Sequence, residues 1–452
     1  MKGSLIISLV LFLSAAEASI NDFRDLIRVE TWQEIWPDSS GDLASRSVTA
    51  EVWTEAMQAG LDSRKTLHLP ARELPYYIDA PLILSSGQTL TADPGAEIRL
   101  KPGTNTCMVR NKNLIGFADR VVPSGTLPDT DITIAGGIWT TLSTAAGETN
   151  GNLRGASSKD NAVPGTHGVI LLQNVRRVVV KNVTVRQSRA FAVHLANSHE
   201  FTVDGITLEG HRRDGVHVNG PASDGFIRGV SGDSHDDTVA LNAWEWKNYA
   251  PSFGPIHDIV IDEVRGAPEG MPSANSIRLL AGRKRFSDGV ILDCPIHNIT
   301  LRRITDITEF KLYDQPNLEL GRDKDYSIGV GTIRNLHFED LTFRRPGRIE
   351  IHAEVDGLTL RNATVESEGP LISIGPKSGT YKFGSDPARW VEIFSPDLDC
   401  TVKNVVVSGV RLYGETGEIP PERLIEVIEQ KINPDYPQTT PRGGTGRGIW
   451  IQ

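Results

Sequence analysis

Residues 178–185 read VVVKNVTV, and residues 201–208 read FTVDGITL. In each segment an apolar residue is followed three positions later by another, and the two residues between them break the alternation. Two short strands joined by a bend produce this pattern, because the same face points inward before and after the bend. The pattern recurs at 226–232, 259–266, 299–307, 336–343, 358–365 and 405–412. Helices do not repeat in this way, so the repeat predicts short strands.

The paired apolar residues mark one position on each turn of a repeating coil. They are Val180/Val183, Val203/Ile206, Ile227/Val230, Ile261/Val264, Leu301/Ile304, Phe338/Leu341, Leu360/Ala363 and Val407/Val410. The shortest intervals are 22 to 24 residues, and the longer ones carry insertions. One coil cannot bury its inner face alone, whereas stacked coils share a core and pair their backbone edges. We therefore predict an all-β fold, a right-handed parallel β-helix, over residues 65–415.

Both ends of the predicted solenoid carry other patterns. Residues 48–61 (VTAEVWTEAMQAGL) show helical spacing, and a helix there would cap the open end within an N-terminal cap region at 19–64. At the other end, residues 416–452 are predicted to form a short helix and a tail rich in Pro and Gly.

The first 18 residues resemble a secretory signal peptide. A lysine near the start, an apolar run from Leu5 to Leu13 and the small-x-small sequence ending at Ala18 predict cleavage near Ala18. The apolar run is too short to span a bilayer. We therefore expect a secreted or periplasmic protein.

The net charge and the cysteines limit which partners and cofactors are expected. The net charge of −10 and the pI near 5.6 argue against a nucleic acid or a membrane surface as the partner. Cys107, Cys294 and Cys400 are far apart and lack the spacing of metal ligands. No cofactor or metal is expected, and the oligomeric state stays open.

A second strand family lies out of phase with the first. It includes 191–197, 214–220, 237–242 and 275–280, in which Val193, Val216 and Val239 follow at intervals of 23 residues. These strands are expected to stack in register as one wall of the solenoid.

This register brings aspartates together. Asp214 and Asp237 each precede an inward valine by two residues, so they occupy the same position on adjacent coils, and Asp236 lies beside them. Like charges this close raise one pKa, and a protonated acid beside an ionised base is what cleavage of a glycosidic bond needs. The alternatives are a Ca²⁺ site and aspartates that cap turns.

Six further residues are candidate substrate contacts: His217, Arg278, His235, Asn219, Asn242 and Trp244. His217 and Arg278 occupy outward positions of the second strand family, so they are expected to line a groove near the aspartates. Asn219 and Asn242 share a column and either contact sugar hydroxyls or form a structural asparagine ladder. Trp244 opens an insertion, where its ring either stacks on a sugar or packs the insertion against the solenoid.

These motifs resemble those of the polygalacturonase-like glycoside hydrolases, a pectin-degrading β-helix family. That family carries Asn-Thr-Asp-Gly, then Gly-Asp-Asp about one coil later, then Gly-His-Gly and Arg-Ile-Lys. Here RRDG at 212–215 matches the Asp-Gly half of the first motif, and HDD at 235–237 matches the Asp pair of the second. The resemblance implies an inverting hydrolase in which Asp236 is the general acid and Asp214 and Asp237 hold the attacking water.

Two departures from the family pattern bear on the substrate. No Gly-His-Gly follows the Asp pair, which leaves His217 or His235 for that role, and the third motif reads Arg278-Leu279-Leu280 without the lysine. The resemblance therefore implies a divergent member that acts on a pectin-like or another acidic polysaccharide. Two other functions compete: a polysaccharide lyase in which aspartates bind Ca²⁺ and Arg278 abstracts a proton, and a non-catalytic glycan-binding β-helix.

Overall fold

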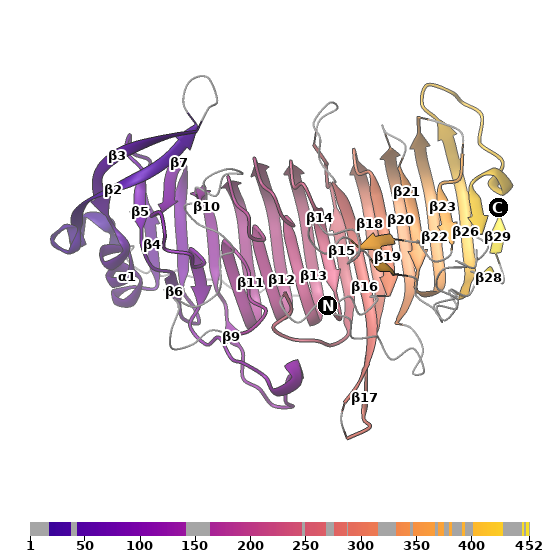
Figure 1. The fold of residues 1–452 in the computed structure, drawn as a ribbon, viewed down its shortest axis with the longest axis horizontal. Helices are drawn as coiled ribbons and strands as arrows, with labels where there is room; N and C mark the ends of the chain where they lie inside the picture. Colours follow the sequence, from indigo (N-terminus) through magenta and orange to yellow (C-terminus); the bar gives the residue numbers. More distant parts are fainter. Residues whose placement is uncertain are drawn as a thin grey trace, which may run out of the picture.

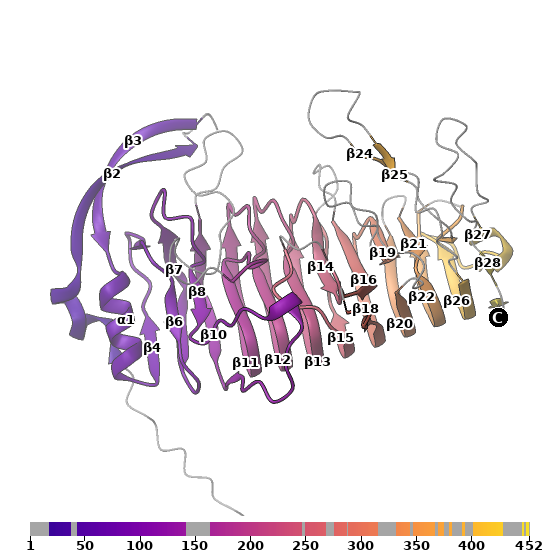
Figure 2. The ribbon, with the colours of Figure 1, turned by 60° about the horizontal axis from the view of Figure 1, so that its bottom comes forward.

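The computed structural model describes residues 18–37, 43–141, 163–245, 249–267, 275–286, 288–314, 331–343, 347–366, 369–374, 379–381, 391–393, 401–427, 445–446 and 449–451. These residues form a right-handed parallel β-helix, in which strands stack in sequence order along one long axis (Figure 1). The all-β fold predicted from the repeat is confirmed. The second view shows the same stack with the strands aligned side by side (Figure 2).

The predicted register is confirmed coil by coil. Val180 pairs with Val203, Val203 with Ile227 and Ile227 with Ile261, and the remaining pairs continue the column. Those remaining partners are Leu301, Phe338, Leu360 and Val407. All eight residues are buried, at 1% exposure or less. The apolar pattern therefore marks the inner face of the solenoid.

The two-residue break in each repeat is a sharp bend in the backbone. Its second residue has a positive φ in all eight repeats, at Asn182, Gly205, Gly229, Glu263, Arg303, Asp340, Asn362 and Gly409. The left-handed region favours Gly, Asn and Asp, and these types occupy six of the eight positions. This bend turns the chain while the side chains on either side of it stay inward.

Two strand columns follow from the two families. The first wall consists of β10 (Thr133–Thr140), β15 (Ile256–Asp262), β18 (Ile296–Thr305), β20 (Thr332–Phe343), β22 (Glu354–Val365) and β26 (Thr401–Leu412). The second consists of β14 (Asp237–Asn242), β16 (Ser276–Arg285), β19 (Glu309–Asp314), β21 (Arg348–His352), β23 (Ile372–Ile374) and β27 (Ile425–Val427). Three long strands run through both walls: β11 (Ile170–Arg186), β12 (Val193–Glu209) and β13 (Val216–Gly232). The second wall carries the aspartates.

Earlier coils and short strands complete the stack. The N-terminal coils contain β1 (Ala18–Ser19), β4 (Thr66–Leu69), β5 (Tyr76–Ile78), β6 (Leu82–Leu84), β7 (Thr89–Leu100), β8 (Val109–Asn111) and β9 (Asp129–Thr130). Strand β17 (Ile291–Cys294) pairs antiparallel with the end of β16, and β24 (Gly379–Tyr381) pairs with β25 (Val391–Ile393). The last strands are β28 (Thr445–Gly446) and β29 (Ile449–Ile451), both beside β26.

The N-terminal end combines a hairpin with a helix. Strands β2 (Arg28–Pro37) and β3 (Leu43–Val52) pair antiparallel, and helix α1 spans Thr54–Ser63. The helix buries Met57 and Leu61 and contacts β4 and β6. The prediction of a helix from Val48 was wrong for its first five residues, because Val48–Val52 pairs with β2 in an extended conformation. That α1 caps the solenoid stays a prediction.

Short 3-10 helices lie outside the strands in the described part of the chain. They are η1 (Ile20–Leu26) and η2 (Ala118–Arg120) in the N-terminal half, and η5 (Pro421–Arg423) near the C-terminus. The last of these lies where a short C-terminal helix was predicted. Apart from the short strands β28 and β29, the predicted Pro/Gly-rich tail lies outside the described residues, as do residues 1–17 of the predicted signal peptide. Within the described ranges, no helix is both long enough and apolar enough to span a membrane.

Candidate active site

The three aspartates predicted to cluster lie together at the start of two adjacent strands. Asp214 precedes β13 and Asp237 begins β14, with Val216 and Val239 paired in register behind them. One oxygen from each of Asp214, Asp236 and Asp237 lies within 4.8 Å of the other two. The coils approach this closely because residue 215 is glycine: a Cβ there would lie 2.6 Å from the carbonyl oxygen of Thr238.

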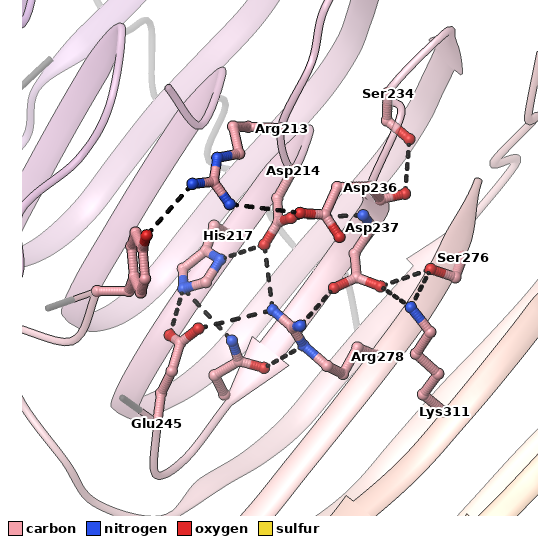
Figure 3. A network of polar contacts seen from close by, with 12 residues as sticks. Arg213, Asp214, His217, Ser234, Asp236, Asp237, Glu245, Ser276, Arg278 and Lys311 are labelled. Carbon is pink, nitrogen blue, oxygen red and sulfur yellow. Dashed lines mark hydrogen bonds and ion pairs between the residues drawn. The ribbon is translucent and has the colours of Figure 1, made fainter. Parts of the chain in front are cut away.

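Asp237 is buried and held by cations. Arg278 Nη1 lies 2.9 Å from its Oδ2, while Lys311 Nζ at 3.1 Å and Ser276 Oγ at 2.5 Å donate to its Oδ1 (Figure 3). Burial opposes the charged form, but Arg278 and Lys311 outweigh it, so the pKa of Asp237 lies below its ordinary value. Asp237 is therefore ionised at neutral pH.

Asp236 has the opposite electrostatics. Its side chain is 33% exposed, and its nearest cation is Arg213, with 3.8 Å between Nη1 and Oδ2. Burial and the charges of Asp214 and Asp237 together raise the pKa of Asp236 to about 7. Two neighbouring carboxyl groups thus differ in their protonation at neutral pH, which is the requirement for an acid and a base side by side.

A buried relay connects Asp214 to a fourth acidic residue. His217 Nδ1 lies 2.6 Å from Asp214 Oδ2, and His217 Nε2 lies 2.9 Å from Glu245 Oε2. Burial disfavours the imidazolium, yet Glu245 and Asp214 raise the pKa of His217 to about 9. Burial also opposes the charge of Glu245, but His217 and Arg278 lower its pKa to about 2. His217 and Glu245 are therefore both charged at neutral pH, and Phe191 stacks on His217 with 3.8 Å between ring centroids.

Arg278 joins these groups from β16. Its Nη2 lies 3.3 Å from Asp214 Oδ2 and 3.6 Å from Glu245 Oε1, and its Nε donates to Asn242 Oδ1 at 3.2 Å. Asn219 Nδ2 donates to Glu245 Oε2 at 3.0 Å. Both asparagines are fully buried, so these hydrogen bonds hold Glu245 and Arg278 in place.

The structure places the remaining candidates around this cluster. His217 was expected to line the groove, but it is fully buried, because Phe191 and Glu245 cover its outward position. His235 Nε2 contacts Asp233 Oδ2 at 2.9 Å. Trp244 is 9% exposed and packs near Phe253, with 6.3 Å between ring centroids. Of its two interpretations, the structure favours packing of the insertion.

Glu245 and Lys311 were not predicted from the sequence as site residues. Glu245 lies in the insertion, between the aromatic residues Trp244 and Trp246. Lys311 occupies the coil after Arg278, to which it is paired in register. The alternation in residues 309–314 (EFKLYD) continues the second strand family, and this pattern could have predicted that Lys311 lies beside Arg278. A lysine thus contacts Asp237 from the coil after the one that carries Arg278.

The carboxylates offer oxygen ligands of the kind that Ca²⁺ takes. Asp214, Asp236 and Asp237 are the candidates for such a site. However, Arg278 and Lys311 already contact Asp237, and Arg278 also contacts Asp214. A divalent cation would be repelled by both cations, so the arrangement suits proton transfer better than metal binding.

Comparison with known proteins gives similarity to solved structures at low identity. No protein-family model matches the sequence, and no curated protein matches it. A family 28 exopolygalacturonase from Yersinia enterocolitica is 12% identical, with 87% of this chain and 82% of that chain covered and a TM-score of 0.44. A polygalacturonase from Erwinia carotovora is 13% identical, with 89% and 94% covered and a TM-score of 0.46.

Proteins with other roles are similar to the same extent. The surface adhesin PfbA of Streptococcus pneumoniae is 11% identical, with 88% of each chain covered and a TM-score of 0.45. The chain is thus similar both to polygalacturonases and to a surface adhesin. These similarities do not set its function, which depends on the residues of its own site.

Proposed function

We propose that this chain is a secreted glycoside hydrolase that cleaves glycosidic bonds in a pectin-like or other acidic polysaccharide. The observation that carries the proposal is the opposite electrostatics of two adjacent carboxyl groups. The pKa of Asp236 is raised to about 7, and the pKa of Asp237 is lowered. Hydrolysis of a glycosidic bond needs one carboxyl group that holds a proton and another that is ionised.

The exposure of each group supports its role. Asp236 is the most exposed of the three, with 33% of its side chain accessible, so it is the general acid that meets the leaving oxygen. Asp214 and Asp237 are at most 1% exposed and are held by Arg278. We assign these two groups to orient and activate the attacking water molecule, which inverts the anomeric centre.

The stereochemistry of the product tests this assignment. Inverting enzymes usually separate their two carboxyl groups by about 6.5–9.5 Å and retaining enzymes by about 5–5.5 Å. Here one oxygen of each carboxyl group lies within 4.8 Å of the others, which is nearer to the retaining range, so the inverting assignment rests on the contacts of Arg278 with Asp214 and Asp237 and not on the spacing. Proton NMR of the fresh product is expected to show the inverted anomer, and a retained anomer would overturn the assignment of Asp214 and Asp237 to water.

Arg278 argues against the lyase alternative. A lyase of this type needs a base that gives up its proton, but Arg278 contacts Asp237, Asp214 and Glu245. Burial opposes its charge, yet these carboxylates raise the pKa of Arg278 further above its ordinary value. An arginine held in this way does not act as a base.

The proposal of secretion rests on the first 18 residues of the sequence. Expression in a host with a general secretory pathway is expected to release a protein whose N-terminus is Ser19. N-terminal sequencing of the extracellular or periplasmic protein tests this, and an uncleaved cytoplasmic product would contradict it.

The activity is tested on a panel of pectic and algal polysaccharides. New reducing ends without ultraviolet absorbance are expected from the wild-type protein, whereas a lyase gives unsaturated products that absorb. Asp214→Asn, Asp236→Asn and Asp237→Asn are each expected to abolish turnover with the fold intact by circular dichroism. Full activity in all three variants would overturn the proposed site. Asp258→Asn, at a position on β15 that is 48% exposed and outside the cluster, is the matched control that is expected to keep full activity.

A further inference from the structure

Arg213 lies directly before Asp214, at the edge of the aspartate cluster. Its guanidinium is on the side of Asp236 that faces away from Lys311 (Figure 3). Nη2 donates to the hydroxyl of Tyr249 at 3.2 Å, and the guanidinium carbon lies 5.3 Å from the centroid of the Tyr249 ring. The side chain keeps 34% of its surface exposed. Tyr249 therefore holds the head group in one place while leaving part of it accessible.

The other cations of the site are already neutralised. His217, Arg278 and Lys311 contact the three carboxylates of Asp214, Asp237 and Glu245 at distances of 3.6 Å or less. Each of these cations is thus paired with at least one carboxyl group. Arg278 and Lys311 are also only 13% and 18% exposed, so little of either is open to a ligand.

Arg213 is different, because its only acidic neighbour within ion-pair distance among the described residues is Asp236, at 3.8 Å. Asp236 must carry a proton when it acts as the acid, and it is then neutral. A guanidinium has five N–H donors, and here a single hydrogen bond, to Tyr249, engages them within the described part of the chain. The site therefore carries one uncompensated positive charge beside its acid.

The coils place this charge relative to the bond that is cleaved. Asp236 immediately precedes β14, and Arg213 precedes β13, which lies on the coil before β14. Lys311 lies on β19, two coils after β14. Adjacent coils are about 4.8 Å apart. A sugar chain that runs along the stack across Asp236 therefore lies over Arg213 on its N-terminal side.

We propose that Arg213, oriented by Tyr249, binds an anionic substituent on the sugar unit that lies on the β13 side of the cleaved bond. The substituent is a carboxylate or a sulfate ester, because the planar guanidinium fork matches two oxygens of either group. This inference rests on the proposed function and names its substrate class.

Binding to the full-length protein tests the subsite without requiring turnover. Isothermal titration uses an Asp236→Asn background and three probes: an oligogalacturonate, a sulfated galacto-oligosaccharide and a neutral galacto-oligosaccharide. Adding Arg213→Gln is expected to weaken binding of at least one anionic probe by about 10-fold or more, since it removes charge-assisted hydrogen bonds. Binding of the neutral probe is expected to stay unchanged, and the stronger anionic probe identifies the substituent.

Arg212→Gln is the matched control. It makes the same change in charge one residue away, where the side chain is exposed, and it is expected to leave all three affinities unchanged. Tyr249→Phe removes the hydroxyl that orients Arg213 and is expected to weaken the anionic probe by a smaller factor. Thermal melting checks that each variant is folded, and Arg213→Lys, which retains the charge, is a second variant expected to bind more weakly than Arg213 does.

Three results would overturn the subsite: equal weakening of charged and neutral probes, equal effects of Arg212→Gln and Arg213→Gln, or no binding of either anionic probe before Arg213 is changed. Hydrolysis measured separately on the wild-type protein distinguishes the two proposals. Charge-selective binding through Arg213 without hydrolysis would overturn the proposed function and support the subsite. Hydrolysis without charge-selective binding would support the proposed function and overturn the subsite.

Discussion

His217 makes the stability of this protein depend on pH in a window where few other groups titrate. The histidine is fully buried between Asp214 and Glu245, and its pKa is raised from 6.5 to about 9. A group with a raised pKa in the folded state stabilises fully below its unfolded pKa and loses that contribution as pH rises through the folded pKa. We therefore expect the free energy of unfolding to fall between pH 6.5 and pH 9.

The size of this fall follows from the shift. About 2.5 pH units at about 1.36 kcal/mol each give a loss of about 3 kcal/mol. The raised pKa of Asp236 acts in the same direction, but only up to about pH 7. Cys107, whose pKa burial raises to about 12, contributes mainly at the upper edge of the window and above it. The slope above pH 7 therefore reports chiefly on His217.

Urea unfolding followed by tryptophan fluorescence, at half-unit steps of pH across this window, measures the effect. His217→Gln removes the cation between two buried carboxylates and leaves them only Arg278, so it is expected to destabilise the protein by about 3–5 kcal/mol at the lower end of the window. Its stability is expected to be nearly independent of pH above 7. Glu245→Gln removes the strongest charge that raises the pKa of His217 and is expected to reduce the slope without abolishing it.

His337→Gln is the control for removing a histidine, because residue 337 is exposed and lies on β20, outside the site. It is expected to keep the wild-type pH dependence. If His217→Gln lost as much stability between pH 7 and pH 9 as the wild-type protein, or if the wild-type protein showed no slope there, the raised pKa of His217 would be refuted.

Further predictions concern the acid, the absence of a metal requirement and the core. Since the general acid must be protonated, kcat/KM is expected to fall as pH rises above about 7. Lys311→Met removes a charge that lowers the pKa of Asp236, so the pH at which kcat/KM falls is expected to move higher. Lys403→Met, on the surface, is expected to leave that pH unchanged. Dialysis against a chelator is expected to preserve activity, and loss restored by Ca²⁺ would favour a lyase. Phe310→Ala is expected to cost about 3–5 kcal/mol in urea unfolding, because Phe310 is 1% exposed in the core; a cost below 1 kcal/mol would contradict this.

The register of the solenoid could be predicted from the sequence because it depends on a local pattern. Each coil repeats the same inward pair, and the inward residues of consecutive coils must meet in the shared core. The 23-residue interval between Val216 and Val239 therefore sufficed to place Asp214 next to Asp237. The prediction of a helix from Val48 failed because the pairing partner of that segment, β2, lies upstream and has no repeat to reveal it.

The rest of the site depends on insertions that no repeat describes. An outward position on a strand is normally a surface position, but the segment that follows β14 brings Glu245 back over His217 and buries it. Lys311 is similarly separated from Arg278 by an insertion, although both occupy one column. Alternation predicts which way a side chain points, and tertiary contacts decide what it meets there.

Hydrolysis in water enriched in ¹⁸O tests the proposed function most directly. Because a water molecule held by Asp214 and Asp237 is proposed to attack the sugar, mass spectrometry is expected to find one ¹⁸O atom at each new reducing end. The same assay with Asp236→Asn is expected to give no product, since the variant lacks the group that protonates the leaving oxygen. Products that contain no ¹⁸O and absorb in the ultraviolet, or undiminished cleavage by Asp236→Asn, would contradict hydrolysis at this aspartate cluster.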